Sequence, residues 1–137
     1  MDDYFAAGPL IAARLTAQLA GVNIKSTWGI PRIQEQFDLP PAVLVSLEDD
    51  RPDEIVNWTS QKVEQIWTCV VVVSDPDNEA GSLISQVIQA MNGWQPSGSG
   101  TPFSPFQRVK SELQHECSPN GVLYFPLAFS TTFVFNS

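Results

Sequence analysis

Apolar positions recur with helical spacing in two segments of the chain. The first runs from about Pro9 to Ala20, where Pro9 suits the first helical position and Gly21 can end the helix in a left-handed turn. The second follows a turn at 74–78 and ends at Gly93. Its stripe, spaced i, i+3, i+4, i+7, i+8 and i+11, consists of Ala80, Leu83, Ile84, Val87, Ile88 and Met91. Both segments are therefore predicted to be amphipathic helices.

Alternating and continuous apolar runs predict strands. Ala42 to Glu48 places apolar residues at every second position, and Gln61 to Ser74 begins with alternation and ends apolar on both faces. Such a change is typical of a sheet that becomes covered on both sides. These two strands are expected to form a long antiparallel hairpin, joined through the turn-rich acidic stretch 49–54.

The C-terminal third predicts two more strands. Phe106 to Cys117 alternates, with Val109, Ser111, Leu113 and His115 on one face, and residues 123–135 carry large side chains on one face. Pro126 has no N–H for a ladder, so an edge or a bulge is expected there. Val22 to Thr27 is a candidate short strand, and residues 30–39 are expected to be irregular or a single helical turn.

This element order predicts an α+β fold. Its economical form is a single antiparallel sheet (mixed pairing is open) of four to five strands, with two helices packed on one face. The length of 137 residues suits a single domain, 1–137, with flexible loops at about 49–60 and 95–105.

The charge balance excludes some partners. Seven Lys and Arg stand against 15 Asp and Glu, for a formal charge of −8, which argues against general nucleic-acid binding and against anionic membranes. Charged residues make up only 16% of the chain, against about 25% in an average domain, and apolar residues 43%. A short chain of this kind is expected to bury surface in a subunit interface.

The chain is expected to be neither membrane-inserted nor secreted. No apolar run approaches the ~18 residues of a membrane span, and the acidic start, Met1 to Tyr4, differs from a basic signal peptide. In a cytosolic product Cys69 and Cys117 would both be reduced.

Candidate chemistry is weak throughout. His115, Glu116 and Cys117 include metal-capable side chains, but neighbours in a strand point to opposite faces and no second cluster completes a site. The stretch 75–79 resembles the start of a calcium loop, yet Ala80 stands where the turn needs glycine. Helix capping by Asp77 or Asn78 is the better explanation.

Nucleophilic and phosphate-binding motifs are also incomplete. Gly98, Ser99 and Gly100 lack the following Lys of a phosphate loop, and the single histidine has no serine elbow to pair with. The carboxylates of the 49–54 stretch are expected to be solvated. We therefore predict no catalytic residues, no metal and no cofactor.

Tryptophans are the more informative group. Trp28, Trp58, Trp67 and Trp94 lie outside the helical stripe, and three of them are next to turns. Each can be a core anchor, but an exposed Trp in a chain with little charge is also typical of a ring interface.

Three segments together resemble a known family. They are Asp3 to Ala7 followed by Leu10 to Leu15; the order of Trp67 to Val73, a Ser74-Asp75 turn, the helix from Glu79 and Gly93-Trp94; and the closing strand Tyr124 to Thr131. The pattern is similar to the tail terminator proteins of long-tailed bacteriophages, the group that includes minor tail protein U of lambda and the Mu-like terminators. The likeness covers roughly Asp3 to Phe133 in element order and length.

The resemblance implies a structural virion protein in the tail-neck region. It would form a homohexameric ring on the phage tail tube, halt tube polymerisation, and offer head-tail connector (neck) proteins a surface, while DNA passes through the lumen without specific binding. The family has no catalytic residues to carry over. Partner-binding residues are expected in the two polar loops: Asp49, Asp50, Arg51, Asp53 and Glu54 in the first, and Gly98, Ser99, Gly100, Phe103 and Phe106 in the second.

Two alternatives stay open on the sequence. One is a head-completion or neck connector protein of a tailed phage, whose size and composition are similar. The other is a small α+β enzyme or ligand-binding domain with a concave apolar site near Trp94.

Overall fold

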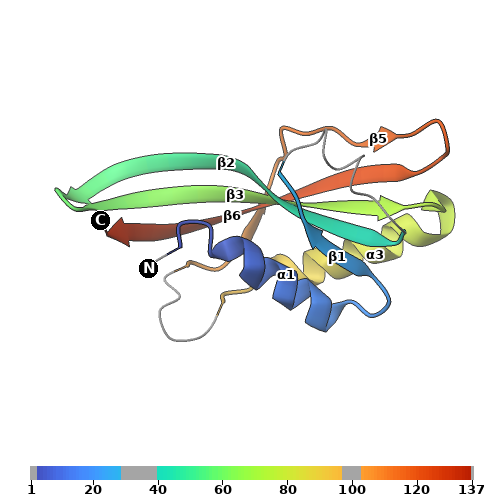
Figure 1. The fold of residues 1–137 in the computed structure, drawn as a ribbon, viewed down its shortest axis with the longest axis horizontal. Helices are drawn as coiled ribbons and strands as arrows, with labels where there is room; N and C mark the ends of the chain where they lie inside the picture. Colours follow the sequence, from blue (N-terminus) through green and yellow to red (C-terminus); the bar gives the residue numbers. More distant parts are fainter. Residues whose placement is uncertain (1–2, 29–39, 97–102, 137) are drawn as a thin grey trace.

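Three long strands dominate the computed structural model of the chain, which describes residues 3–28, 40–96 and 103–136 (Figure 1). The described residues form one six-stranded sheet in the order β1-β2-β3-β6-β4, with β5 also paired to β6. The strands are β1 (Asn23–Ser26), β2 (Ala42–Asn57), β3 (Ser60–Val73), β4 (Gln107–Val109), β5 (Glu116–Cys117) and β6 (Leu123–Asn136). Only β1 and β2 pair in parallel, so the sheet is mixed.

Both predicted helices form, and both lie on the same face of the sheet. Helix α1 spans Ala7–Gln18 and helix α3 spans Pro76–Met91. They share one buried cluster with the sheet residues that face them, among which Trp67, Val71 and Phe129 are central. The α+β fold with two helices on one face is therefore confirmed, with one more strand than the upper expectation.

The opposite face of the sheet carries a second, smaller cluster. Ala42, Leu44, Val70 and Val72 are buried there, and Val122 and Tyr124 pack against them. This explains why residues 70–73 are apolar at every position: both faces of β3 are covered at this end of the sheet.

Three sequence predictions are wrong in detail. Residues 49–57 are strand rather than loop, because β2 continues to Asn57. The predicted strand 106–117 breaks into β4 and β5, with residues 110–115 off the sheet. The start of α3 lies at the Asp75 cap with Pro76 in the first turn, so Asp77 and Asn78 are inside the helix and do not cap it. The segment 30–39 lies outside the described residues.

The predicted interruption at Pro126 is confirmed. β3 pairs with one side of β6 along its whole length, with Val70 opposite Pro126. On the other side, β5 pairs with residues 123–124 and β4 with residues 128–130. Pro126 therefore sits between the two short strands, where no ladder partner among the described residues needs its missing N–H.

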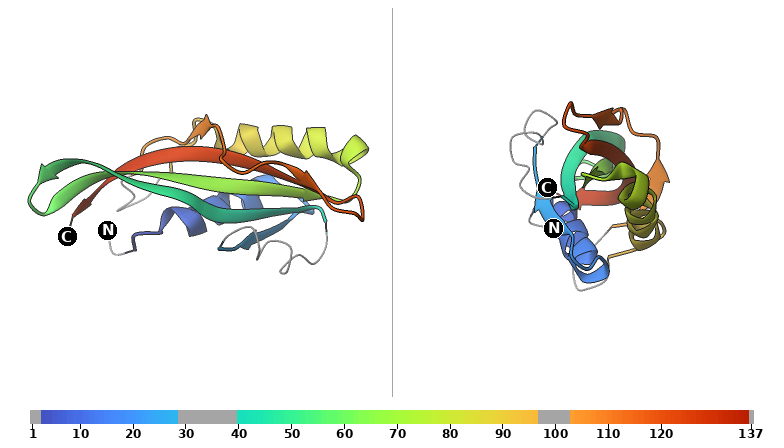
Figure 2. Two further views of the ribbon diagram at one scale, coloured as in Figure 1. Left: turned by 90° about the horizontal axis from the view of Figure 1, so that it is seen from above. Right: turned by 90° about the vertical axis from the view of Figure 1, so that its right-hand side faces the viewer.

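The β2–β3 hairpin extends well beyond the helices. Figures 1 and 2 show its turn projecting from one end of the molecule, with the end of β6 beside it and both helices under the other part of the sheet. We call residues 51–61, which contain this turn, the hairpin end.

Candidate partner-binding surfaces

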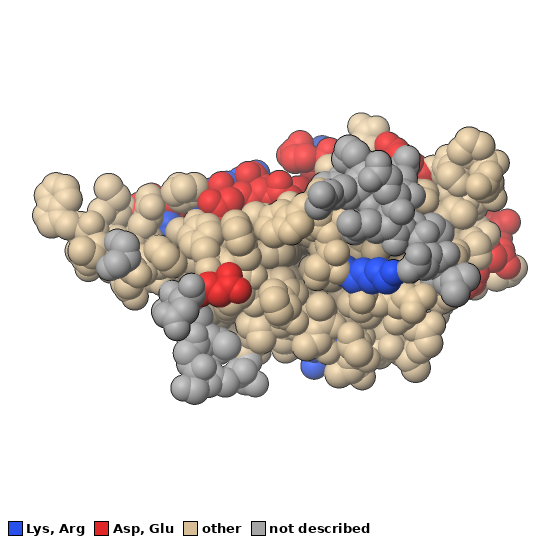
Figure 3. Space-filling view, viewed as in Figure 1, with Lys and Arg blue, Asp and Glu red and all other residues tan. Residues whose placement is uncertain are grey.

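The hairpin end exposes large apolar side chains. Trp58 is 100% exposed, Ile55 71% and Val56 56%. Figure 3 shows that the projecting end is mostly uncharged, whereas acidic side chains gather over the middle of the molecule. Exposed apolar groups packed this closely in a chain of this size typically mark a contact with another molecule.

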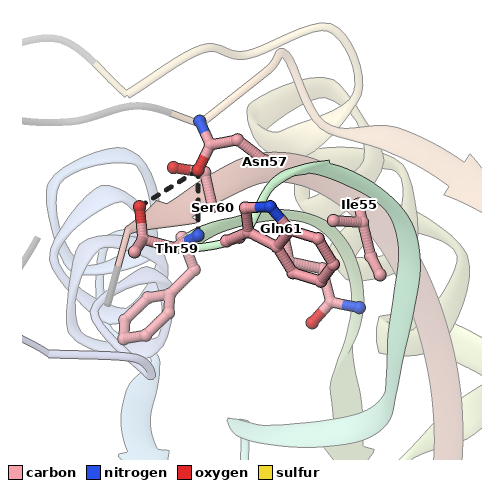
Figure 4. A pocket seen from close by; sticks show the side chains of 7 residues that line it. Ile55, Asn57, Thr59, Ser60 and Gln61 are labelled. Atoms are coloured by element: carbon pink, nitrogen blue, oxygen red, sulfur yellow. Dashed lines mark hydrogen bonds between the residues drawn. The ribbon is translucent and has the colours of Figure 1, made fainter.

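Hydrogen bonds hold the turn that presents Trp58. The Asn57 side-chain oxygen accepts from the Thr59 backbone N–H at 2.9 Å and from the Thr59 hydroxyl at 3.0 Å (Figure 4). The Ser60 hydroxyl donates to the Asn136 side chain, which ties the turn to the end of β6. Trp58 is therefore carried on an ordered turn.

A shallow recess lies against this turn. It has a volume of about 350 Å³ and is lined by Ile55, Asn57, Trp58, Thr59, Ser60, Gln61 and Phe135 (Figure 4). Its lining has no charged group, and its one buried polar side chain, Ser60, is already bonded to Asn136, so the recess resembles a protein contact more than a small-molecule site.

The acidic residues predicted to bind partners separate into two groups. Asp50 turns toward the helix face of the sheet, where its carboxylate accepts from the Tyr4 hydroxyl and the Gln65 amide, both at 3.1 Å. Asp53 and Glu54 are exposed on the hairpin end. Asp50 therefore has a role in the fold, while the other two are available to a partner.

Asp49 and Arg51 form a surface ion pair. The Arg51 Nε lies 2.6 Å from an Asp49 oxygen, and its Nη1 lies 3.6 Å from Glu64. The hydrogen bond from Arg51 lowers the pKa of Asp49. Both side chains stay accessible and remain candidate contact residues.

A buried hydrogen-bond chain explains why Asp50 turns inward. Gln65 is fully buried; its amide nitrogen also donates to the Tyr4 carbonyl at 3.2 Å, and its oxygen accepts from the Trp67 indole at 3.1 Å. Burial and the contact with Asp50 raise the pKa of Tyr4 to about 12. This chain joins the N-terminal residues to β2 and β3.

A groove lies beside β4, at the edge of the sheet where residues 125–127 of β6 are unpaired on that side among the described residues. We call it the β4 groove; its volume is about 500 Å³. The lining comes from 108–111, 113–115 and 125–128, and includes Arg108, Lys110, Leu113, His115, Phe125 and Pro126. The His115 ring stacks on Phe125 with centroids 5.7 Å apart. These residues come from β4, from the segment after it and from β6.

Glu48 fixes the outer wall of the β4 groove. One carboxylate oxygen accepts from the Thr68 hydroxyl at 2.7 Å and the Ser111 hydroxyl at 2.5 Å, and the other accepts from the Glu112 N–H at 3.2 Å. These bonds hold residues 110–115 over the sheet instead of within it.

The second predicted partner-binding segment has a different outcome. Phe103 and Phe106 are 1% and 0% exposed and belong to the core, so their side chains are not on the surface of the chain. Phe106 stacks on Trp94, with ring centroids 5.6 Å apart and planes 9° apart. Gly98, Ser99 and Gly100 lie outside the described residues.

The four tryptophans divide between core and surface. Trp67 is buried and lies so close to Gly8 that an added Cβ there would come within 2.9 Å of the indole. Trp94 is half-buried, with the Arg14 guanidinium 5.4 Å from the ring centroid. Trp28 is 57% exposed and packs edge-on against Phe5. Only Trp58 is exposed completely.

Sequence reasoning named Trp58 as a possible interface residue but missed Ile55 and Val56 beside it. The available signal was Ile55-Val56 beside Trp58, in a stretch that would otherwise be polar. Because its acidic neighbours favour a polar loop, the sequence does not predict that this stretch is a strand with apolar side chains.

Reactive groups are few in the described part of the chain. Cys69 is buried, which raises the pKa of its thiol to about 12, whereas Cys117 is exposed. No cluster of three metal-binding side chains occurs among the residues that the structure describes. Within the same ranges, neither helix has the length and apolar character that a membrane span requires.

The geometry is that of a protein that acts through contacts: an elongated sheet with a projecting apolar end and a groove at the β6 edge. Comparison with known proteins agrees. A family model described as "Phage tail terminator protein" matches residues 1–137, and the chain belongs to this family. It is therefore a structural protein of phage tails, and its family is not an enzyme family.

A solved structure has a similar fold. A chain of the "Virion of native gene transfer agent (GTA) particle" matches with a TM-score of 0.65 and 13% identity, over 96% of this chain and 99% of that one. At this identity the likeness shows a shared fold. A comparison with curated proteins finds no match.

Proposed function

We propose that the chain forms a six-fold ring on the end of the phage tail tube, stops tube polymerisation there, and provides the surface on which head-tail connector proteins join. The carrying observation is the hairpin end, which places exposed Trp58, Ile55 and Val56 beyond the body of the molecule. A projecting surface that contacts a different surface of the next copy gives a head-to-tail arrangement, and such contacts form a ring when the rotation between copies closes. Membership in the tail terminator family supports this assignment.

The charge of the chain suits a ring through which DNA passes. Six copies at −8 each carry a formal charge of about −48. Acidic groups that face a lumen would repel the DNA backbone, so DNA would pass without binding. We propose tail tube protein, neck proteins and further copies of this chain as the partners, assembled in the host cytoplasm and then located at the tail-neck junction of the virion.

The exposed charges of the hairpin remain candidate contacts. Asp49, Arg51, Asp53 and Glu54 all lie on β2, in or beside the hairpin end. We propose that they contribute to contacts within the ring or with the tube, while Asp50 acts through its hydrogen bonds in the fold.

Solution mass, measured by light scattering over a concentration series, tests the proposal. A ring has a mass of about 91 kDa, six times the 15.1 kDa chain, and negative-stain images would show it alone or on purified tail tubes. A closed dimer with a self-complementary interface would contradict the ring. So would a chain that stays monomeric and leaves tube ends uncapped and still growing.

A further inference from the structure

The β4 groove is basic, although the chain is acidic. Among its lining residues are Arg108 and Lys110, and no carboxylate. Both are exposed, and neither forms an ion pair with a described residue. In a chain with 15 acidic and seven basic residues, a groove whose lining carries only basic charges is unusual. The Glu48 carboxylate is bonded into the wall at Ser111 and Glu112 and is not itself part of the lining. Its complement is an acidic ligand with apolar side chains.

The groove is also open toward a ligand. Between the stretches paired with β5 and β4, residues 125–127 of β6 have no strand partner on that side among the described residues. Leu113, Phe125 and Pro126 supply apolar lining. A volume of about 500 Å³ falls in the usual range for pockets, roughly 300–1,000 Å³, and is sufficient for an indole ring.

The hairpin end has the complementary chemistry. The hairpin end contains Asp53 and Glu54, and its one basic residue, Arg51, is already paired with Asp49. The apolar side chains of Ile55, Val56 and the fully exposed Trp58 follow directly along the chain. The acidic and apolar groups occur together on one projecting turn, as the basic and apolar groups do in the groove.

The two surfaces of one chain cannot meet each other. Ala128, at the edge of the groove, lies opposite Thr68 of β3, whereas the hairpin turn begins at Ser60 of the same strand. At the rise of a strand, this separates the surfaces by roughly 25 Å. Because β3 runs as one continuous strand between them, the hairpin end can fill only the groove of another molecule.

We propose that the hairpin end of one copy docks in the β4 groove of a second copy, with Trp58 in the groove and Asp53 and Glu54 facing Arg108 and Lys110. The inference rests on the proposed ring and names the contact that builds it. Each copy gives one hairpin end and receives another, so the contact is heterologous and repeats around the ring.

Charge reversal and complementation test the contact. The first variant, Trp58→Ser, removes the indole from the hairpin end; the second, Arg108→Glu with Lys110→Glu, reverses the charge of the groove. We expect each alone to raise the concentration needed for ring assembly at least tenfold, by light scattering. The matched control is Trp28→Ser, which removes another exposed indole that lines neither the β4 groove nor the hairpin-end recess and should leave assembly unchanged.

Mixing the two defective variants gives a sharper result. The first keeps an intact groove and the second an intact hairpin end, so an equimolar mixture should form one good contact and stop at a dimer of about 30 kDa. Adding Asp53→Lys and Glu54→Lys to the groove-reversed chain should restore the ring, because the charges are then exchanged on both sides.

Three outcomes would overturn the proposal. If Trp58→Ser and the groove variant both form rings at the same concentration as the wild type, this contact is excluded, although the proposal of a ring still stands. If Trp58→Ser forms rings normally but these rings no longer bind tail tubes, the hairpin end contacts the tube protein instead of a second copy. A wild-type chain that forms no ring, alone or on tubes, would instead remove the proposed function itself.

Discussion

The two ends of the β2–β3 pair are made of the same strands but lie in opposite environments. At one end, residues 42–46 and 69–73 are buried on both faces. At the other, residues 51–59 are all exposed, although Ile55, Val56 and Trp58 are as apolar as the core. The helices and the small outer cluster cover the first end, and nothing in the described chain covers the second. Apolar residues at the covered end therefore stabilise the fold, whereas those at the exposed end are available to bind a partner.

The strongest way to break this comparison is to truncate one aromatic residue at each end. Phe129→Ala, in the core, should lower the free energy of unfolding by about 3–5 kcal/mol, because it leaves a cavity under the helices. Trp58→Ala should change it by no more than about 0.5 kcal/mol. Urea unfolding of the unassembled chain measures both. A large loss for Trp58→Ala would show that the hairpin end belongs to the fold.

A second substitution tests where the covered end of β3 stops, at the buried residue Gln65. Gln65→Leu replaces the amide with an apolar side chain of similar size. The Trp67 indole N–H then lacks its acceptor, and Asp50 has one donor fewer. We expect a loss of about 1–3 kcal/mol in the free energy of unfolding, since buried polar groups become unpaired.

Urea unfolding measures this loss, with Gln61→Leu on the hairpin end as a control, whose amide makes only one long bond of 3.4 Å. Equal stabilities for the two variants would contradict a structural role for the buried chain.

The smallest predicted effect is the contribution of Tyr4 to the free energy of unfolding, and it depends on pH. The folded-state pKa of Tyr4 is raised from 10.0 to about 12, so the folded chain holds this proton more tightly than the unfolded chain. The stabilisation is complete below pH 10 and is lost as the pH rises toward 12. Tyr4→Phe removes the bond to Asp50 and should cost roughly 1 kcal/mol at neutral pH.

Thermal unfolding at several pH values measures the gap between wild type and Tyr4→Phe. The gap should narrow between pH 10 and 12, because only the wild type loses the proton at this position. Cys69, whose pKa is also raised to about 12, titrates in both proteins and cancels in the comparison. A gap that is constant across this range would show that Tyr4 makes no such bond.

The sequence predicts the periodic elements well and the non-local contacts poorly. The stripe from Ala80 to Met91 identifies α3 because helical spacing is a local signal, and the alternation in β6 is equally local. Phe103 packs against Phe133 of β6, which lies far along the chain, and Phe106 stacks on Trp94, which precedes it by 12 residues. No nearby pattern reveals that these two residues are core rather than contact residues.

The acidic stretch misleads for a physical reason. Asp49, Asp50, Pro52 and Asp53 are poor strand formers, so propensity favours a loop. Yet β1 pairs only with residues 42–45, so among the described residues β2 is an edge strand at Pro52, where a missing N–H costs no ladder bond. Irregular pairing between Leu47 and Asp49 and between Pro52 and Ile55 accommodates the remaining residues.

The opposite error occurs after β4, where the sequence predicts a strand and the chain leaves the sheet. Residues 106–117 alternate as a strand should, but Glu48 accepts from Ser111 and Glu112 and holds this segment above the sheet. A single distant carboxylate, which the sequence pattern does not reveal, thereby creates the wall of the β4 groove.

Side-chain labelling of the assembled protein tests the central claim most directly. Hydroxyl-radical labelling, read by mass spectrometry, reports the solvent exposure of each tryptophan before and after assembly with tail tubes. The account predicts that Trp58 is labelled strongly in the free chain and becomes protected on assembly, together with Leu113 and His115 of the β4 groove, while Trp28 keeps its labelling. Trp58 labelled equally in free and assembled protein would contradict the claim that the hairpin end is a contact surface.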